Sequence, residues 1–211
     1  DAGCGYGRLA IPIATHNNDF RIVAIDASKV MLKYFALLVE ENQNEINKKN
    51  IFLVNCGIDL LPFSSNTFDY IYSSAVLLHN PYNNIDRIIS EWKRILKPSG
   101  KIILSNSFPS LYNFNGIMSY LYLKFGKKKL KSLNGPVRPF SKKMVSTLFS
   151  DWKNVEIYPS GTLFIPKGIA RLKLPFHKKL KIINNLLSKL KNKYFIDSEI
   201  FSLELDVIAR K

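Results

Sequence analysis

The sequence predicts an α/β fold, with a doubly wound and mostly parallel sheet, an antiparallel strand near the C-terminus and a basic helical cap. Three observations support this prediction. Short apolar runs alternate with helical patterns through residues 20–105, which is typical of parallel sheets. A glycine-rich loop at residues 1–7 directly precedes a helical pattern, and sheets of this kind bind ligands at such a loop. With 46% hydrophobic and 22% charged residues, the 211-residue chain has a globular composition.

The elements of the first half are bounded by turn and capping residues. Strands are expected at residues 20–25, 51–55, 68–73 and 101–105. After the first strand, Ser28 is expected to cap a helix over 30–39. A second helix over 85–96 is expected to end in a turn at 97–100, because that segment contains Pro and Gly.

The second half is expected to close the sheet and carry the cap. Ser141 is a predicted N-cap for a helix reaching 149, and residues 155–158 and 203–209 are expected to form the closing strands. Between those strands, residues 177–193 have apolar positions on one helical stripe and lysines largely off it. We therefore divide the chain into a cofactor-binding core (1–107), a cap or substrate insertion (108–140), and a closing unit (141–211) with a basic amphipathic insertion at 160–201.

The charge is concentrated in the second half of the chain. The formal net charge is +15; residues 1–110 hold 11 basic and 10 acidic residues, whereas residues 111–211 hold 20 and 6. This asymmetry predicts one neutral region and one region that faces an anionic partner or surface. The alternative interpretation is a lysine-rich bias that keeps the protein soluble.

Cysteine content and hydropathy predict a cytoplasmic protein. Cys4 and Cys56 form neither a metal-binding spacing nor a disulfide framework, so no metal is expected and a reducing compartment is the default. No apolar run reaches the roughly 18–20 residues of a membrane-spanning helix. We expect at most a peripheral contact with an anionic membrane.

The glycine loop and a strand-terminal carboxylate together predict a nucleoside-containing cofactor. Gly3, Gly5 and Gly7 stand at alternate positions, which lets the backbone turn sharply and approach a ligand. Asp26 ends the next predicted strand, where its carboxylate can accept bonds from both hydroxyls of a ribose. The spacing is G-x-G-x-G rather than the G-x-G-x-x-G of dinucleotide-binding proteins.

Four segments in order resemble the class I S-adenosylmethionine-dependent methyltransferases. They are DAGCGYGR at the start, VAIDAS at 23–28, DLLPFSSNTFDYIYSSAVLLH at 59–79 and LKPSGKIILS at 96–105. The resemblance is to methyltransferase type 11, in the group that includes enzymes of ubiquinone and menaquinone biosynthesis. It covers residues 1 to about 105 and implies a Rossmann-like core, S-adenosyl-L-methionine as cofactor and methyl transfer to a small-molecule or lipid-like acceptor.

The resemblance also implies a set of cofactor contacts at the loop and the strand ends. These are Asp1, Gly3 and Gly5 along the methionine and ribose part; Asp26 at the ribose hydroxyls; Ala27, Ser28 and Ile58 around the adenine; and Ser73 and Ser74 at the methionine end, which opens onto the substrate.

The chain departs from the pattern of this family at two places. Where family members often carry an Asp that bonds the adenine amino group there is Gly57, and Asp59 lies two positions later. Either Asp59 substitutes for that Asp, or backbone and apolar contacts alone hold the adenine. The chain also begins at the loop itself, without a preceding first strand, which indicates a fragment of a longer reading frame. We expect the fragment to be less stable than the full protein, or another element to fill the gap, since unpaired sheet edges are costly.

Methyl transfer from a sulfonium is an in-line displacement, for which the protein mainly aligns the nucleophile, the methyl group and the sulfur. A general base is required only where the acceptor is not already nucleophilic. His79, just after the third strand, is the candidate for that base or for a substrate contact. The alternative is a histidine that only packs in a loop.

Three interpretations of the basic second half stay open. An apolar cap with basic rims fits a lipid-like acceptor, with the amphipathic helix on an anionic membrane. Lysines interleaved with Tyr and Phe fit RNA, although no RNA-binding module is present. The third interpretation is a helix that packs on the protein's own core with solvated lysines. From a different class, a non-catalytic relative that binds the cofactor weakly or not at all also remains an alternative.

Overall fold

The computed structural model of the 211-residue chain describes all residues except 18, 43, 112–113, 126–137 and 163–201. In its first part the elements are α1 (Ala10–His16), β1 (Ile22–Asp26), α2 (Lys29–Glu41), a 3-10 turn η1 (Lys48–Asn50) and β2 (Ile51–Asn55). They are followed by β3 (Phe68–Ser74), a 3-10 turn η2 (Leu77–His79), α3 (Tyr82–Ile95), β4 (Leu96–Pro109) and α4 (Phe114–Phe125). The last elements are α5 (Lys142–Leu148), β5 (Lys153–Thr162) and β6 (Ser202–Arg210).

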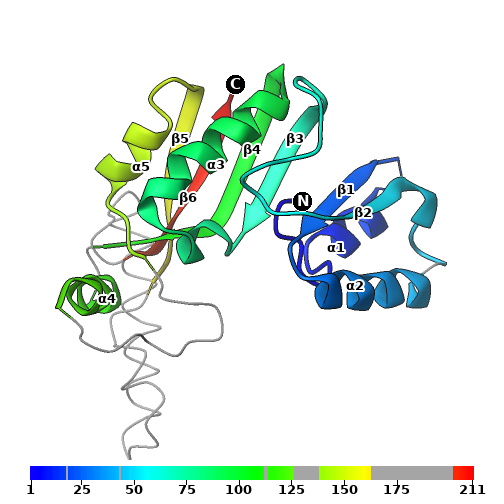
Figure 1. The fold of residues 1–211 in the computed structure, drawn as a ribbon, viewed down its shortest axis with the longest axis horizontal. Helices are drawn as coiled ribbons and strands as arrows, with labels where there is room; N and C mark the ends of the chain where they lie inside the picture. The colour runs from blue at the N-terminus through cyan, green and yellow to red at the C-terminus, as the bar shows by residue number, and fades with distance from the viewer. Residues whose placement is uncertain (18, 43, 112–113, 126–137, 163–201) are drawn as a thin grey trace, which may run out of the picture.

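The strands form two hydrogen-bonded groups that confirm the predicted α/β class. β1 pairs with β2 in parallel, and β3 pairs with β4 in parallel within a second group of order β3-β4-β6-β5. β6 runs antiparallel to both β4 and β5, as the sequence predicts for the C-terminal strand. Figure 1 shows β1 and β2 with α1 and α2 at one end, and β3 to β6 with α3 and α5 at the other.

The first two residues join these groups. Ala2 forms a parallel bridge with Ile25 of β1, and its N–H donates to the Tyr72 carbonyl of β3 over 3.0 Å. The Ile25 N–H donates in turn to the Asp1 carbonyl at 2.9 Å. The N-terminus therefore lies between β1 and β3 (Figure 1).

Beside this junction, a shallow apolar groove lies between β1 and β3. Its walls include Val23, Phe63, Phe68, Ile71, Trp92 and Ile95. Among the described residues, only Asp1 and Ala2 bridge the two strands by backbone hydrogen bonds. The expected loss of stability stays a prediction, to be checked by comparing the melting of this chain with that of a longer one.

The core divides between the two faces of β1. Ile22 and Ala24 pack with α1 and α2, whereas Ile25 joins the larger cluster formed by β3, β4, β6, α3 and α5. Trp92 of α3 is fully buried at the centre of that larger cluster. The alternation of side chains along strand β1 thus gives it two covered faces.

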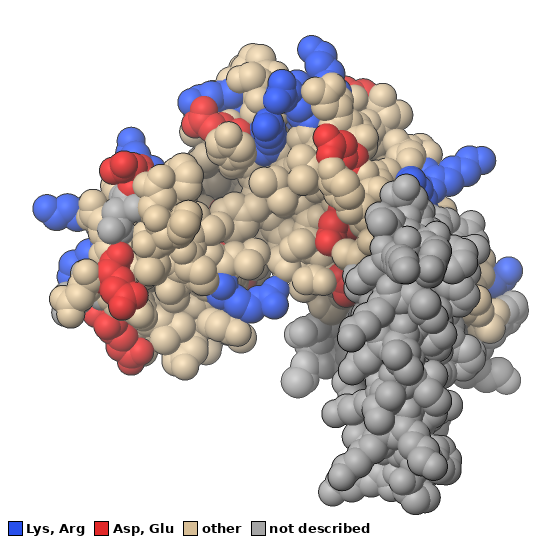
Figure 2. All heavy atoms as spheres, turned by 180° about the vertical axis from the view of Figure 1, so that it is seen from behind, with Lys and Arg blue, Asp and Glu red and all other residues tan. Residues whose placement is uncertain are grey.

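Among the described residues, β3 and β4 are covered on one face only. Ile71 and Ile102 are buried on the side of α3, but Tyr70 and Ile103 on the other side are 57% and 40% exposed. Figure 2 shows this side of the molecule, with basic and acidic side chains interspersed over the part that the structure describes.

Element boundaries follow the sequence closely, with one difference in kind. β2 matches its prediction, and Ser28 and Ser141 each accept a hydrogen bond from the amide three residues on, as N-caps do. Residues 97–100, however, lie inside β4 instead of forming a turn before it. They form a bulge in β4. Phe68 of β3 is opposite Leu96, and Tyr70, two residues later, is opposite Lys101, five residues after Leu96.

Most of the predicted basic region lies outside the described residues. Thirteen of the 20 basic residues of the second half fall within 126–137 and 163–201, including the whole amphipathic segment 177–193. Of the predicted cap, the structure describes α4, which follows β4 directly. No helix among the described residues is long and apolar enough to cross a membrane.

Candidate cofactor site

The glycine loop turns back on the end of β1. The N–H groups of Gly3 and Cys4 both donate to the Ile25 carbonyl at 2.9 Å. Gly3 has a φ of +75°, and a Cβ there would lie 2.4 Å from the Val76 side chain. Gly5 has a φ of +55°, and a Cβ there would meet nothing within 4 Å. The loop is thus closed by Val76 at Gly3 and open at Gly5, where a ligand can approach the backbone.

Asp26 fixes the open part of this loop. Its Oδ2 accepts the Gly5 N–H at 2.8 Å, and its Oδ1 accepts the Ser28 N–H at the same distance. Each carboxylate oxygen has a second acceptor position after these bonds. The carboxylate is therefore positioned by the backbone and still able to accept two hydroxyl donors, which fits the predicted contact with a ribose.

The backbone around Asp26 is held by a residue that the sequence pattern did not single out. The Asn55 Nδ2 donates to the carbonyls of Asp26 and Ala27 at 2.8 and 3.1 Å. Asn55 ends β2 and pairs in register with Asp26. The sequence signal that could have identified Asn55 is an amide side chain at the end of the adjacent parallel strand. Asn55 fixes the backbone of Ala27, which together with Ser28 is predicted to lie beside the adenine.

The two serines that end β3 have different surroundings. Ser73 is 1% exposed and its hydroxyl donates to the Ala2 carbonyl at 2.6 Å, which secures the junction between β1 and β3. Ser74 points to the other face, where its hydroxyl accepts from Arg8 Nη2 at 3.1 Å. The structure therefore brings Ser74 to the glycine loop and uses the Ser73 side chain within the core.

The chain leaves β3 through a strained residue. Ala75 has a φ of +60° and its N–H donates to the Ser105 carbonyl at 3.1 Å. A left-handed conformation is costly for a residue with a Cβ and is often found next to functional sites. This turn delivers Val76 onto Gly3 and leads into η2, which contains His79.

His79 is partly buried, and Arg138 lies beside it. The Arg138 guanidinium donates to the His79 carbonyl at 3.0 Å, and the imidazole Nδ1 is buried with no hydrogen-bond partner among the described residues. Burial and the positive charge of Arg138 lower the pKa of His79 below its ordinary value. The imidazole is consequently neutral at pH 7 and able to accept a proton.

The segment after β2 carries the predicted adenine contact. The carbonyl of Ile58 accepts the Trp92 Nε1–H at 2.9 Å, and its side chain packs against the larger core cluster. Asp59 Oδ1 lies only 2.9 Å from where a Cβ of Gly57 would be. The carboxylate of Asp59 thus lies beside the position from which an Asp at 57 would extend. Its Oδ2 also forms an exposed ion pair with Arg87 at 3.5 Å.

The predicted site residues share one edge of the molecule. Asp26 is hydrogen-bonded to the loop 1–7, Ser74 is hydrogen-bonded to Arg8 directly after that loop, and Ile58 follows β2, the neighbour of β1. Ligands of open α/β sheets bind at the carboxyl ends of parallel strands, and this edge is formed by those ends. The described residues contain no group of three or more His, Cys, Asp or Glu side chains that could hold a metal ion.

Comparison with known families finds a match over the same segment. The methyltransferase domain family matches residues 1–104. A demethylmenaquinone methyltransferase of Bacillus licheniformis is 30% identical over 175 residues, covering 75% of this chain and 72% of that protein. A malonyl-(acyl-carrier protein) O-methyltransferase of Buchnera aphidicola is 30% identical over 135 residues, covering 64% and 49%.

The chain spans only part of other relatives, including 36% of an uncharacterized chloroplastic methyltransferase of Arabidopsis thaliana that is 25% identical over 64% of this chain. Among solved structures, YcgJ of Bacillus subtilis has a TM-score of 0.65 at 18% identity, covering 100% of this chain and 90% of that one. A SAM-dependent methyltransferase of Methanosarcina mazei has the same score and coverage at 16% identity. These two similarities show the fold. Together with the family match they confirm the resemblance carried by the four motifs, and the chain belongs to the S-adenosyl-L-methionine-dependent methyltransferase family.

Proposed function

We propose that this chain binds S-adenosyl-L-methionine at the glycine loop and transfers its methyl group to a small-molecule or lipid-like acceptor. The contact between Gly5 and Asp26 carries the proposal. It fixes a carboxylate with free acceptor positions beside a stretch of backbone that faces open space. A nucleoside with an extended polar chain needs this combination of acceptors and unobstructed backbone.

The assignments of individual contacts are part of the proposal. Asp1, Gly3 and Gly5 line the methionine and ribose part, Asp26 accepts the ribose hydroxyls, Ala27, Ser28 and Ile58 surround the adenine, and Ser73 and Ser74 lie at the methionine end. Support is strongest for Asp26 and Gly5, which contact each other at 2.8 Å. For Ser73 the contact is made by the backbone, because its hydroxyl is committed to the Ala2 carbonyl.

The cofactor supplies the activated methyl group on its sulfonium, so the chain's own residues bind, orient and exclude water. His79 is the residue that accepts a proton from an acceptor hydroxyl or amine. Burial and the positive charge of Arg138 lower its pKa and so favour the neutral imidazole. It lies three residues beyond Val76, which packs on the glycine loop.

The acceptor side of the proposal rests on α4. This helix follows β4 and exposes apolar side chains, among them Ile117, Tyr120 and Leu121. A surface of that composition suits an apolar acceptor or the headgroup region of a membrane. The two relatives named above as methyltransferases of demethylmenaquinone and of malonyl-acyl-carrier protein act, by their names, on small or lipid-like molecules.

A transfer assay tests the proposal. The chain is incubated with methyl-labelled S-adenosylmethionine and, in separate reactions, a prenylated quinol, malonyl-acyl-carrier protein and structured RNA. Label is expected in one of the first two acceptors and absent from RNA. Asp26→Asn is expected to abolish transfer, because the new amide N–H opposes the N–H of Gly5 or Ser28. The matched control is Asp69→Asn, since the Asp69 carboxylate forms an exposed ion pair with Lys97 at the start of β3, the opposite end of that strand from Ser74.

Methyl transfer to RNA and to neither of the other acceptors would contradict the proposed acceptor class and favour an RNA methyltransferase. A folded chain that transfers no methyl group to any acceptor and binds no cofactor would contradict the proposal and favour a non-catalytic relative.

A further inference from the structure

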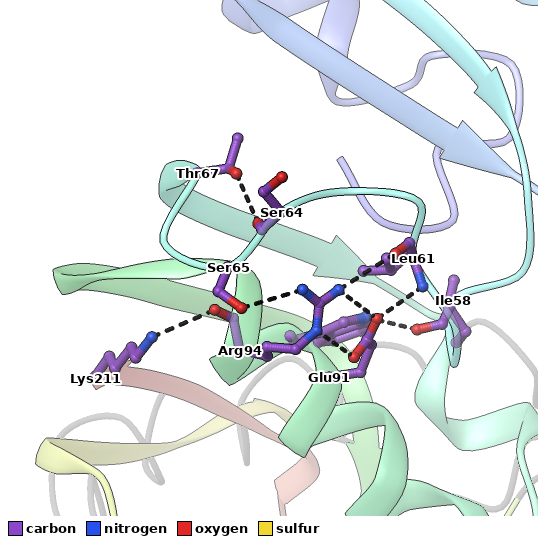
Figure 3. A network of polar contacts seen from close by, with 9 residues as sticks. Ile58, Leu61, Ser64, Ser65, Thr67, Glu91, Arg94 and Lys211 are labelled. Carbon is purple, nitrogen blue, oxygen red and sulfur yellow. Dashed lines mark hydrogen bonds and ion pairs between the residues drawn. The ribbon is translucent and has the colours of Figure 1, made fainter.

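One helix holds the segment that carries Ile58 and Asp59. α3 contacts residues 58–67, here called the adenine-side loop, through side chains and backbone (Figure 3). We infer that Glu91, Trp92 and Arg94 are positioning residues that set the adenine end of the cofactor site by fixing this loop. The inference rests on the proposed function.

Trp92 fixes the start of the loop. Its indole ring is fully buried in the larger core cluster, so the direction of its Nε1–H is determined by packing. That N–H donates to the Ile58 carbonyl at 2.9 Å. The backbone of the predicted adenine contact is therefore tied to a closely packed part of the helix.

Glu91 and Arg94 hold the middle of the loop. Glu91 accepts a bidentate pair of bonds from Arg94 Nη2 and Nε, both at 2.8 Å, and its Oε1 also accepts the Leu61 N–H at 2.8 Å. Arg94 Nη2 reaches the Leu61 carbonyl at 3.3 Å. The ion pair thus bonds both backbone polar groups of Leu61, whose side chain is itself buried. The Glu91 side chain is 13% exposed and that of Arg94 is 37% exposed, so the carboxylate end of the pair is the better shielded from solvent.

The end of the loop is fastened by backbone bonds from the last turn of α3. The N–H of Asn66 donates to the Arg94 carbonyl at 3.1 Å and that of Thr67 to the Ile95 carbonyl at 2.7 Å. Arg94 Nη1 also donates to Ser65 Oγ at 3.3 Å. Lys211 at the C-terminus adds a bond to Asn66 Oδ1 at 2.8 Å. With start, middle and end fixed, the loop between them has a defined shape.

This arrangement differs from one that only stabilises the fold. Leu61 lies three residues from Ile58, the predicted adenine contact, and two from Asp59, so a shift of its backbone moves both residues. Sites lose affinity when the residues that support the contacting groups are loosened, because the bound geometry must then be ordered on binding. Residues with a structural role alone would lower stability and leave the affinity of the folded protein unchanged.

The test compares ligand affinity in Glu91→Gln with the wild type by calorimetry. The amide introduced by this change keeps one acceptor for the Leu61 N–H and loses the bidentate charged pair. We expect the Kd for S-adenosylmethionine to rise about tenfold. The Kd for adenosine, a probe of the adenine end alone, is expected to rise by the same factor. Lys97→Gln is the matched control, because it removes the exposed Lys97–Asp69 pair and is expected to leave both affinities unchanged.

Trp92→Phe is the second variant, since it keeps an aromatic ring in the core and removes the donor to Ile58. It is expected to weaken both ligands about threefold. Hydrogen exchange at the Leu61 amide is expected to accelerate in Glu91→Gln and to stay at the wild-type rate in Lys97→Gln. Each variant is first shown to be folded by its circular dichroism spectrum and thermal melt.

Three outcomes overturn the inference in distinguishable ways. A folded Glu91→Gln that binds both ligands within twofold of the wild type overturns the positioning role and leaves the proposed function standing. If neither variant folds, these residues have a structural role alone, and the inference is overturned as well. A folded wild-type chain that binds neither ligand overturns the proposed function, and this inference with it.

Discussion

The N–H of Gly5 donates to the Asp26 carboxylate over 2.8 Å, across 21 residues of sequence. This single contact fixes the open part of the glycine loop against the end of β1. The other oxygen of the carboxylate holds the first turn toward α2 through the Ser28 N–H. The loop, the strand and the helix at the predicted cofactor site are therefore linked through one side chain.

Gly3 and Gly5 of the loop are expected to respond differently to substitution by alanine. Gly5→Ala adds a methyl group in open space, so its stability cost is limited to the positive φ, about 1–2 kcal/mol. The same methyl group occupies the space assigned to the cofactor, and we expect affinity to fall at least about tenfold. Calorimetry and thermal melts measure the two effects separately.

Gly3→Ala is the comparison for that experiment. Its Cβ would lie 2.4 Å from Val76, so we expect a stability loss larger than that of Gly5→Ala. Equal affinity of wild type and Gly5→Ala for S-adenosylmethionine would place the cofactor elsewhere.

Substitution of Ser73 is expected to affect mainly stability, and substitution of the adjacent Ser74 mainly cofactor binding. Ser73→Ala leaves the buried Ala2 carbonyl without its donor, which is expected to cost about 1–3 kcal/mol of unfolding free energy. Ser74→Ala removes an exposed contact with Arg8 and is expected to change stability by less than about 0.5 kcal/mol. Cofactor affinity is expected to fall in Ser74→Ala more than in folded Ser73→Ala. Urea titration and calorimetry check both, and the reverse order would contradict these two roles.

The Glu91–Arg94 pair predicts a specific acid dependence of stability. Hydrogen bonds from Arg94, together with the Leu61 N–H, lower the pKa of Glu91 from its ordinary value of 4.5 to about 2. A carboxyl with a lowered folded pKa binds fewer protons when folded, so its contribution is complete above pH 4.5 and is lost as the pH falls toward 2. The stability difference between wild type and Glu91→Gln is therefore expected to shrink between pH 4.5 and 2. A constant difference across that window, measured by urea titration, would contradict the assignment.

His79 predicts a second pH effect, with its own window. Because burial and Arg138 lower its folded pKa, the unfolded chain binds the proton more readily below its ordinary pKa of 6.5. Stability is thus expected to decrease as the pH falls below 6.5, and His79→Gln is expected to remove that part of the decrease. If His79 is the base, the same variant also loses the acidic limb of the pH–rate profile together with most of kcat. A kcat within twofold of the wild type would exclude that role.

The local elements of the fold were predictable because each depends on residues close in sequence. The apolar run at 51–55 forms β2, the side chains of Ser28 and Ser141 cap α2 and α5, and the glycine spacing locates the loop. Asp26 was identifiable for the same reason, as a carboxylate at the end of an apolar run.

The contacts that hold the site together were not predictable in this way. Asn55 reaches Asp26 from 29 residues away, Arg8 reaches Ser74 across 66, and Glu91 reaches Leu61 across 30. Each of these polar residues is ordinary in its local pattern, and its role depends on which strand or loop the fold places beside it. The bulge of 97–100 in β4 has the same origin, since pairing with β3 overrides the local preference for a turn.

The central claim is that Asp26 and the glycine loop bind S-adenosylmethionine, and calorimetric titration of the chain tests it most directly. We expect saturable binding with one site per chain, lost in Asp26→Asn and retained in Asp69→Asn. Binding of equal affinity in Asp26→Asn, or no binding by a folded wild-type chain, would contradict it.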